Sequence, residues 1–345
     1  MCNKIITHHM VADMKNRYKI ILGVALSAFF LYLSLRKVDF GQMAEAFSRA
    51  NYWYIVPAIV IVFLSHWLRA VRWKLLLYPI HVAATGRLYV ALLLGYWANN
   101  FLPAHLGEFL RAYIISKKEN ISASSAFGTI VIERIIDVFT LLFLMAVTLI
   151  IFPFPAWVTK SGYITFAVSI LLLLLLIFMK KYNKKSVAIL KKLVKPISES
   201  LYEKILLLMD SFFQGITPLK DGVHYVYVSF LSILIWACYA YVFYLSFQAF
   251  NFIDQFSLPW SASLVLLVIT TIAVLVPSSP GYIGTYHYLC MLSLAQFNVP
   301  DSAALTYAFF VHGINFLPLL LIGFILIPFE GLSLRQISKK PDIER

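Results

Sequence analysis

The chain has 345 residues, of which 61% are hydrophobic and only 13% are charged, and its mean hydropathy is +0.81. Soluble domains average about 45–50% apolar and about 25% charged residues, so this composition excludes a soluble globular protein. The net charge is +13, but its clearest cluster, KKYNKKSVAILKKLVK (180–195), lies between two apolar segments and holds seven lysines and no acid. Cytoplasmic loops of membrane proteins attract such clusters, so we expect contact with lipid head groups and not with nucleic acid.

The motifs of metal, disulfide and nucleotide sites are missing from the sequence. Cys2, Cys238 and Cys290 form no CxxC pair, so neither a metal site nor a disulfide framework is indicated. No GxxxxGK[ST] loop is present, which argues against direct coupling to ATP. We therefore expect no cofactor and no metal.

The first apolar run, 18–35, follows a basic N-terminus. A cleaved signal peptide is the alternative interpretation, but Arg36 and Lys37 follow directly and no small-x-small cleavage site is evident. We predict a retained membrane span. The next stretch, FGQMAEAFSRANYW (40–53), has the pattern of an amphipathic interfacial helix with aromatic anchors.

Continuous apolar runs predict an all-α polytopic membrane helix bundle, because the strands of a barrel would alternate over about ten residues. The predicted spans are 18–35, 54–71, 88–102, 126–152, 162–179, 223–250, 260–277 and 302–329. Two of them, 88–102 and 260–277, are short, and each runs into a motif of proline and glycine.

These two short segments predict re-entrant helical hairpins. The first pairs 88–102 with 104–116, and the second pairs 260–277 with 281–297. Two full crossings in each pair would leave every loop on the same side. The choice therefore depends on segment length and on the turn residues Pro103, Gly107, Pro277, Pro280, Gly281 and Gly284. Hairpins that open to opposite faces are typical of inverted repeats, whose broken helices meet at a midplane binding site.

The resulting topology places both termini in the cytoplasm. It comprises a cytoplasmic N-terminus (1–17), a single polytopic membrane domain (18–329) with a basic, partly helical loop at 180–222, and a cytoplasmic tail (330–345). The second span then returns to a group of basic residues on the cytoplasmic side, namely Arg69, Arg72, Lys74 and Arg87.

The first hairpin tip, NNFLPAHLGEFLRAY (99–113), is rich in polar side chains, which are Asn99, Asn100, His105, Glu108 and Arg111. Glu108 and Arg111 stand three residues apart, so they share a helix face and could pair. Ionisable residues at membrane depth usually face protein or water, which favours the lining of a polar cavity. An interfacial turn with a surface salt bridge is the alternative.

The next span, TIVIERIIDVFTLLFL (129–144), carries Glu133, Arg134 and Asp137 inside an apolar run. Arg134 can pair with Asp137 at a spacing of three. One carboxylate is then left in need of a partner, which Arg111 or a histidine could supply. A buried ion network that only fixes helix packing is the alternative to a functional site.

The second tip, PSSPGYIGTYH (277–287), offers Ser278, Ser279, Thr285 and His287 beside its turn residues. Free N–H groups at the start of the following helix would form an anion site. His312 and Asn315 stand three apart in the last span and share a face. A histidine that only packs and forms hydrogen bonds is the alternative to a proton carrier.

Taken in order, PAHLGEFLRAY, VIERIID and PSSPGYIGTYH resemble the membrane region of bacterial lysylphosphatidylglycerol synthases and their stand-alone, flippase-like relatives. The resemblance covers about 20–330 and implies a membrane domain with two re-entrant hairpins. The family's motifs map onto Pro103, Gly107, Glu108 and Arg111, then Glu133, Arg134 and Asp137, then Pro280, Gly281, Gly284 and Thr285. The chain departs from the pattern at His287, where many relatives carry an acid, and at His105, where an arginine is frequent.

The resemblance implies a bacterial inner-membrane flippase that moves a phospholipid or a lipid-linked, polyprenyl-phosphate type intermediate between leaflets through a polar cavity at the hairpin tips. The expected partner is a membrane lipid, either an anionic phospholipid or a lipid-linked sugar. The soluble aminoacyl-transferring domain of the synthases has no counterpart here, so we expect no enzymatic activity. A membrane transferase acting on a lipid-linked substrate and an accessory membrane subunit are the alternatives.

Overall fold

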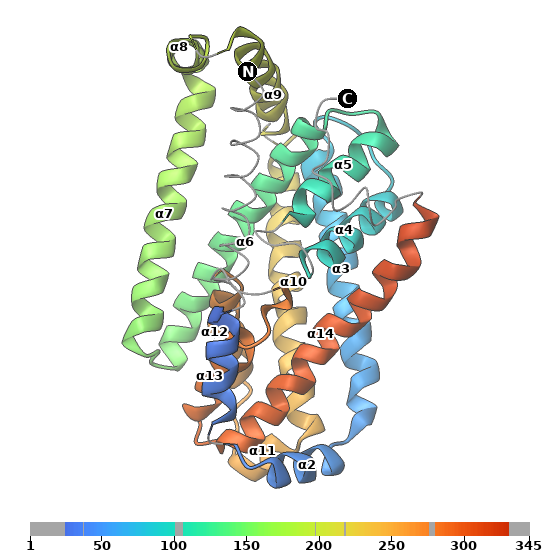
Figure 1. Cartoon of the computed structure of the whole chain (residues 1–345), viewed down its shortest axis with the longest axis vertical. Helices are drawn as coiled ribbons and strands as arrows, with labels where there is room; N and C mark the ends of the chain where they lie inside the picture. Colours follow the sequence, from blue (N-terminus) through green and yellow to red (C-terminus); the bar gives the residue numbers. More distant parts are fainter. Residues whose placement is uncertain are drawn as a thin grey trace, which may run out of the picture. The chain divides into compact units, whose positions relative to one another are not determined.

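The computed structural model describes residues 25–36, 38–100, 106–196, 198–216, 219–275 and 280–330, apart from the side chains of 183–185, 272–275 and Pro280. Within these residues every regular element is a helix (Figure 1). The helices are Ala25–Leu35, α2 (Phe40–Arg49), α3 (Ile55–Leu77), α4 (Thr85–Asn99), α5 (Gly107–Glu119), α6 (Ala123–Ile151), α7 (Ala156–Lys181), α8 (Asn183–Val194), α9 (Glu199–Gly215), α10 (Gly222–Ala249), α11 (Phe252–Phe256), α12 (Ala262–Leu275), α13 (Thr285–Ala295) and α14 (Asp301–Phe329).

Five helices within the described residues are long and apolar enough to cross a membrane. They are Tyr52–Leu77, which includes α3, together with α6, α7, α10 and α14. These five helices coincide with the predicted spans at 54–71, 126–152, 162–179, 223–250 and 302–329. The chain is therefore an all-α, multi-pass membrane protein, as predicted.

The segment between the first two predicted spans forms a separate short helix, α2. Asp39 caps this helix, because its Oδ1 accepts hydrogen bonds from the backbone N–H of Gly41 (2.7 Å) and of Gln42 (3.2 Å). No residue of α2 is buried, and Trp53, just beyond its end, is 83% exposed. Exposed aromatic and amphipathic surfaces of this kind are typical of helices at a membrane interface.

Contacts divide the chain into two compact units. Unit 1 comprises Met1–Val62, Trp97–Leu106 and Tyr239–Leu321, and unit 2 comprises Phe63–Tyr96, Gly107–Cys238 and Ile322–Arg345. The second predicted hairpin belongs to unit 1, whereas the first is divided, with Trp97–Leu106 in unit 1 and the remainder in unit 2. Helices α12 and α13 pack together in unit 1. In unit 2, α4 approaches α5 so closely that a Cβ on Gly95 would lie 3.0 Å from the carbonyl oxygen of Gly107. The re-entrant path of these hairpins and the single domain at 18–329 stay predictions.

Unit 2 is arranged around α6, which packs against α5, α7 and α9. Helices α6 and α9 touch at two glycines, since a Cβ on Gly128 would lie 2.5 Å from the carbonyl oxygen of Phe212. The Ser125 hydroxyl also donates to the carbonyl oxygen of Ser211 at 2.8 Å. The predicted partly helical loop at 180–222 therefore consists mainly of two helices, α8 and α9, and the second of them is fixed to a membrane span.

Unit 1 has an aromatic core where α10, α11 and α14 meet. The ring of Tyr307 is fully buried and stacks on Phe247 at 5.1 Å and on Phe252 at 5.6 Å between centroids. Its hydroxyl donates to the carbonyl oxygen of Phe243 at 2.9 Å, so the one polar atom of the side chain is satisfied. This packing fixes the N-terminal part of α14, the helix that carries His312.

Candidate functional site

Seven charged side chains from three helices of unit 2 form one network, which we call the arginine cluster. Its members are Arg69 and Arg72 on α3, Glu108 and Arg111 on α5, and Glu133, Arg134 and Asp137 on α6. Charged groups at the centre of a membrane span are costly, and they normally pair with one another or line a polar path. The cluster therefore has the strongest chemical signature in unit 2.

Glu133 is the hub of the arginine cluster, and it is completely buried. Its Oε1 lies 2.8 Å from Arg69 Nη1 and 3.5 Å from Arg72 Nη2, and its Oε2 lies 2.5 Å from Arg111 Nη2. One carboxylate thus joins α6 to both α3 and α5. Charge-assisted bonds of this kind are about twice as strong as neutral ones, so Glu133 holds the three helices together.

Asp137 lies one helical turn beyond Glu133 and bonds to the same pair of arginines on α3. Its Oδ1 is 2.7 Å from Arg72 Nη2, and its Oδ2 is 2.9 Å from Arg69 Nη1. Arg72 also bonds to Ser232 on α10, whose Oγ accepts from Nη1 at 2.8 Å, while its buried Nε has no acceptor among the described residues. The predicted contact within α6 is also present but longer, because Arg134 Nη1 lies 3.6 Å from Asp137 Oδ2.

The two ion pairs between α5 and α6 cross over, which differs from the pairing that spacing predicts. Glu108 and Arg111 share a helix face, but Glu108 Oε1 bonds to Arg134 Nη2 at 2.6 Å while Arg111 bonds to Glu133. Pairing across helices satisfies four charges where pairing within α5 would satisfy two. The side chain of Arg134 is 38% exposed and that of Glu108 is 12% exposed, so this pair forms the accessible edge of the arginine cluster.

Positive charge exceeds negative charge in the arginine cluster, because four guanidinium groups face three carboxylates. The surplus is most evident at Arg111, which is 2% exposed. Its Nε and Nη1 have no hydrogen-bond acceptor in the part of the chain that the structure describes. The face of its guanidinium instead lies over the indole of Trp73, 3.6 Å from the ring centroid. Arg111 therefore presents two buried, unused donors, which is the condition for binding an anion.

Arg69 and Arg72 were not predicted as site residues, because their place near the end of a predicted span is typical of a cytoplasmic basic group. Both are buried, with exposures of 4% and 0%. The signal was the continuation of the apolar run: α3 extends to Leu77, so RAVRW (69–73) lies inside the helix and not beyond its end. Two arginines three apart inside an apolar helix predict one buried polar face.

The second predicted tip lies in unit 1 and brings two histidines together. The rings of His287 on α13 and His312 on α14 lie 4.8 Å apart between centroids, edge to face. His312 Nε2 lies 2.9 Å from the carbonyl oxygen of Gly281, and His287 Nδ1 accepts from the backbone N–H of Gly284 at 3.3 Å. Each histidine thus holds one of the two glycines that shape the tip.

One N–H group at the start of α13 already has a partner. The N–H of Gly284, at the helix N-cap, is bonded to His287. His287 has an exposure of 1%, and its Nε2 has no partner among the described residues. The imidazole is thus a second polar group beside the predicted anion site, and the site itself stays a prediction.

Both glycines of the tip have backbone conformations that side chains disfavour, with φ values of 72° at Gly281 and 91° at Gly284. A Cβ on Gly284 would also collide with the backbone carbonyl of Ser27 in helix Ala25–Leu35. A Cβ on Gly281 would lie 2.9 Å from the ring of Phe316. Glycine is thus required at both positions, because the φ angle is positive and because neighbouring atoms leave no room for a Cβ.

Two other predicted site residues bond to backbone groups close to them in sequence. Asn315 donates to the carbonyl oxygen of Val311 in its own helix at 2.8 Å, and Thr285 donates to that of Tyr282 at 3.2 Å. Asn99 and Asn100 are half-buried in unit 1. Pro103, His105, Pro277, Ser278 and Ser279 lie outside the described residues, as does the side chain of Pro280. Within the described part of the chain, no group of three His, Cys, Asp or Glu side chains could hold a metal ion.

Comparison with known proteins identifies a family that this chain matches and several similar proteins. The family model described as lysylphosphatidylglycerol synthase TM region matches residues 20–323. A UPF0104 membrane protein of Methanocaldococcus jannaschii is 23% identical over 91% of this chain and 95% of its own length. A UPF0104 membrane protein of Methanothermobacter thermautotrophicus is 24% identical over 93% and 97%. Glycosyltransferase AglD of Haloferax volcanii is 27% identical, but over only 39% of this chain and 22% of its own length.

Proposed function

Since this chain belongs to the lysylphosphatidylglycerol synthase TM region family, we propose that it moves a lipid with an anionic head group between the leaflets of its membrane. The substrate is a phospholipid or a lipid-linked intermediate of the polyprenyl-phosphate type. Acyl or prenyl tails are already solvated by the bilayer, so the protein mainly has to lower the cost of carrying the polar head group across.

The observation that carries this proposal is the unused capacity of Arg111. Its Nε and Nη1 are buried donors without an acceptor among the described residues, in a cluster with one more guanidinium than carboxylates. A phosphodiester carries one negative charge, and its oxygens accept charge-assisted bonds from arginine N–H groups. Binding one phosphate would therefore neutralise the arginine cluster and give an acceptor to Nε or Nη1, which point to different edges of the guanidinium.

We propose that a head group approaches Arg111 from the accessible edge of the arginine cluster. Arg134 is the exposed member of that edge and bonds to Glu108 at 2.6 Å. A head-group phosphate would compete with Glu108 for Arg134 and then reach the buried donors behind it. Arg134 thus acts as the receiving residue, and Arg111 as the residue that holds the phosphate during transfer.

A transferase acting on a lipid-linked sugar is the second candidate, and the partial similarity to a protein named glycosyltransferase is what favours it. That similarity covers 22% of the Haloferax protein, so its name is weak support for the same chemistry here. We propose transport without enzymatic turnover. The protein would then release its lipid chemically unchanged.

The test is reconstitution of the purified full chain in liposomes that contain a fluorescent phosphatidylglycerol or a fluorescent phosphatidylcholine. Accelerated exchange of the anionic probe between leaflets, measured by chemical quenching of the outer leaflet, is the expected result. The Arg111→Gln variant should lose this exchange, whereas Arg49→Gln, which removes an exposed arginine of α2, should keep it.

Two outcomes would overturn the proposal. Transport would be ruled out if liposomes with and without the protein exchanged each probe at the same rate. The probes are the two phospholipids and a polyprenyl phosphate. Chromatographic detection of a modified lipid, formed by the native chain but not by Arg111→Gln, would replace transport by the transferase.

A further inference from the structure

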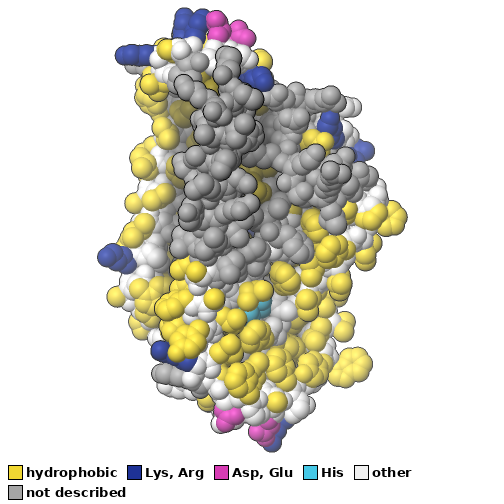
Figure 2. Space-filling model, in the orientation of Figure 1, with side chains coloured by type: hydrophobic (Ala, Val, Ile, Leu, Met, Phe, Trp, Pro, Cys, Tyr) yellow, Lys and Arg dark blue, Asp and Glu magenta, His cyan; other side chains and the backbone are white. Residues whose placement is uncertain are grey.

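Helix α7 is a membrane span with little protein around it. Its only buried residues are Val158 and Gly162, both near its N-terminus, where Gly162 allows Met145 of α6 to approach. Beyond that point its apolar side chains are exposed, for example Leu171 (66%) and Leu174 (57%). Figure 2 shows hydrophobic side chains along this flank of the molecule and lysines at the end where α8 lies.

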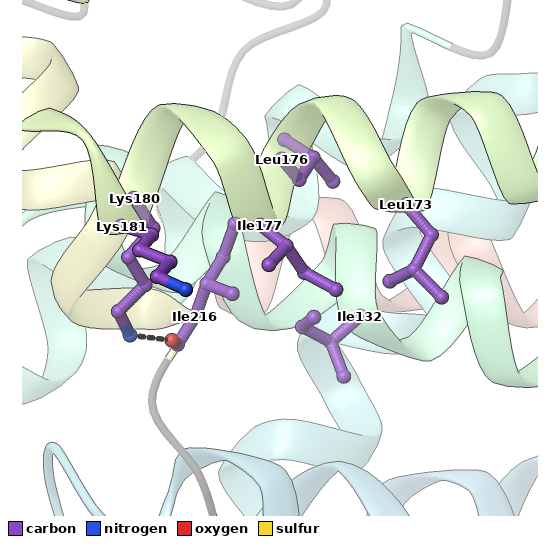
Figure 3. A pocket seen from close by; sticks show the side chains of 7 residues that line it. All are labelled: Ile132, Leu173, Leu176, Ile177, Lys180, Lys181 and Ile216. Carbon is purple, nitrogen blue, oxygen red and sulfur yellow. Dashed lines mark hydrogen bonds between the residues drawn. The ribbon is translucent and has the colours of Figure 1, made fainter. Parts of the chain in front are cut away.

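A groove of about 210 Å³ lies between α7, α6 and the end of α9. Its walls are the side chains of Leu173, Leu176 and Ile177 on α7, Ile132 on α6, and Ile216. Figure 3 shows Leu173, Ile177 and Ile132 pointing toward one another along the groove. Ile177 is 51% exposed, so the groove is open on the side of this residue. The apolar side chains that line the groove suit a hydrocarbon chain.

Two lysines close one end of the groove. Lys180 donates its Nζ to the backbone carbonyl oxygen of Ile216, which fixes that side chain at the rim. Lys181 has no carboxylate partner among the described residues, and its Nζ lies 5.7 Å from the ring centroid of Tyr182. The chain from 180 to 198 contains no acid, so nothing nearby in sequence offsets this charge.

We propose that this groove binds one anionic phospholipid of the surrounding bilayer, with an acyl chain against Leu173 and Ile177 and the phosphate at Lys180 and Lys181. The argument is charge complementarity at the end of an apolar groove. Lysine side chains at the ends of membrane spans extend toward the head-group region, and basic groups there attract anionic lipids. A zwitterionic lipid could fill the apolar part equally well but would gain less from the two ammonium groups.

The site is independent of the proposed transport, because the groove residues and the arginine cluster share no side chain. Phosphatidylglycerol in the groove would fill the space between α6 and α7 that no other described helix fills. We infer that the lipid stabilises the contact of α7 with α6.

The experiment is native mass spectrometry of the full chain in mild detergent, titrated with phosphatidylglycerol or phosphatidylcholine. The native chain should bind its first phosphatidylglycerol about tenfold more tightly than its first phosphatidylcholine. In a chain that also carries Arg111→Gln, so that the arginine cluster does not contribute, K180Q/K181Q should lose this preference, whereas Arg111→Gln alone should keep it. The matched variant K191Q/K192Q, which removes the same charge from α8, should keep it. L173W, which fills the groove and leaves both lysines in place, should weaken binding of both lipids.

Gel filtration and circular dichroism establish that each variant is folded before its titration is interpreted. Equal affinity of the native chain for the two lipids would overturn the proposal. An equal loss in K191Q/K192Q would also overturn it, by showing a diffuse attraction to the basic end of the molecule. If L173W changed nothing while the lysine variant lost binding, the groove would be excluded as the position of the acyl chain. A mass corresponding to two chains, abolished by L173W, would assign the groove to a second copy instead.

Discussion

Arg111 Nη2 lies 2.5 Å from Glu133 Oε2, and this contact joins α5, the second helix of the first predicted hairpin, to the membrane span α6. Both residues are buried, with exposures of 2% and 0%. The same carboxylate bonds to Arg69 through its other oxygen. A single side chain therefore connects the hairpin to two neighbouring helices of unit 2, and this connection leads to the first prediction.

Glu133→Gln should destabilise the protein strongly. The change leaves Arg69 and Arg111 without their carboxylate, and removing one partner of a buried ion pair costs about 3–5 kcal/mol. The loss of stability is measured by heating the protein in detergent and monitoring the remaining folded fraction by gel filtration. Arg111→Gln alone should cost less, because Glu133 keeps Arg69 and Arg72.

The double variant supplies the control for this pair. If Arg111 and Glu133 interact directly, the double variant should be less destabilised than the sum of the single variants, by about 0.5–3 kcal/mol. Strict additivity would contradict the contact.

The sequence predicted the charges on α6 and α5 but not the network that they form. Glu133, Arg134, Asp137 and Arg111 stood out because a charge inside an apolar run is recognisable along the chain. Their partners on α3 stood only a few residues from the expected end of a span, where positive charge normally reports topology. Which arginine meets which carboxylate depends on packing between helices, and spacing along one helix cannot supply that information.

At Gly281 and Gly284 the sequence predicted the local backbone conformation correctly. A motif of prolines and glycines after a short apolar segment predicted a sharp turn, and the φ values of both glycines are positive. The sequence could not reveal that helix Ala25–Leu35 would pack on Gly284, because more than two hundred residues separate them along the chain.

Gly284→Leu should abolish lipid exchange while the chain still inserts into the membrane. A side chain at this position meets the backbone carbonyl of Ser27 and must also adopt a positive φ, so the tip and the first helix would separate. Exchange in liposomes and membrane fractionation measure the two effects. Gly86→Leu is the matched control, because no atom lies within 4 Å of a Cβ there. Normal exchange by Gly284→Leu would refute the role of the tip.

The contact between α9 and α6 should be as sensitive to size as the hairpin tip. A Cβ on Gly128 would lie 2.5 Å from the carbonyl oxygen of Phe212, and backbone atoms cannot move aside as a flexible side chain can. Gly128→Val should therefore release α9 and raise the rate at which a protease cleaves between 195 and 222. Gly222→Val, where a Cβ meets nothing within 4 Å, should leave cleavage unchanged. Equal protection in both variants would argue that α9 is held elsewhere.

The two ends of α7 should lie on opposite sides of the membrane. This helix has 26 residues and is about 39 Å long at about 1.5 Å per residue, which exceeds the hydrocarbon thickness of about 30 Å. The lysines after it predict that its C-terminal end is cytoplasmic. Single cysteines replacing Trp157 and Lys185, in a chain with Cys2 changed to serine, should react with an impermeant reagent from opposite sides. If both cysteines reacted from the same side, the predicted topology would be wrong.

The last prediction concerns His287, whose two ring nitrogens have different environments. Nδ1 accepts from the N–H of Gly284 at 3.3 Å, so in the neutral ring the proton sits on Nε2, which has no partner among the described residues. His287→Ala removes both the cap of the helix start and the buried donor. His287→Asn places an amide oxygen near the position of Nδ1, where it can accept from the N–H of Gly284, and leaves nothing at the position of Nε2.

The two variants therefore separate structure from recognition. If His287 only shapes the tip, Asn should restore both thermal stability and lipid exchange, while Ala restores neither. If the Nε2 donor meets the head group, Asn should restore stability but leave the preference between phosphatidylglycerol and phosphatidylcholine altered. We expect the second result, because a donor buried to 1% exposure without an acceptor is costly unless a ligand uses it. If both variants kept the lipid preference of the native chain, His287 would have a role in packing alone. Its ring centroid lies 4.2 Å from that of Phe309.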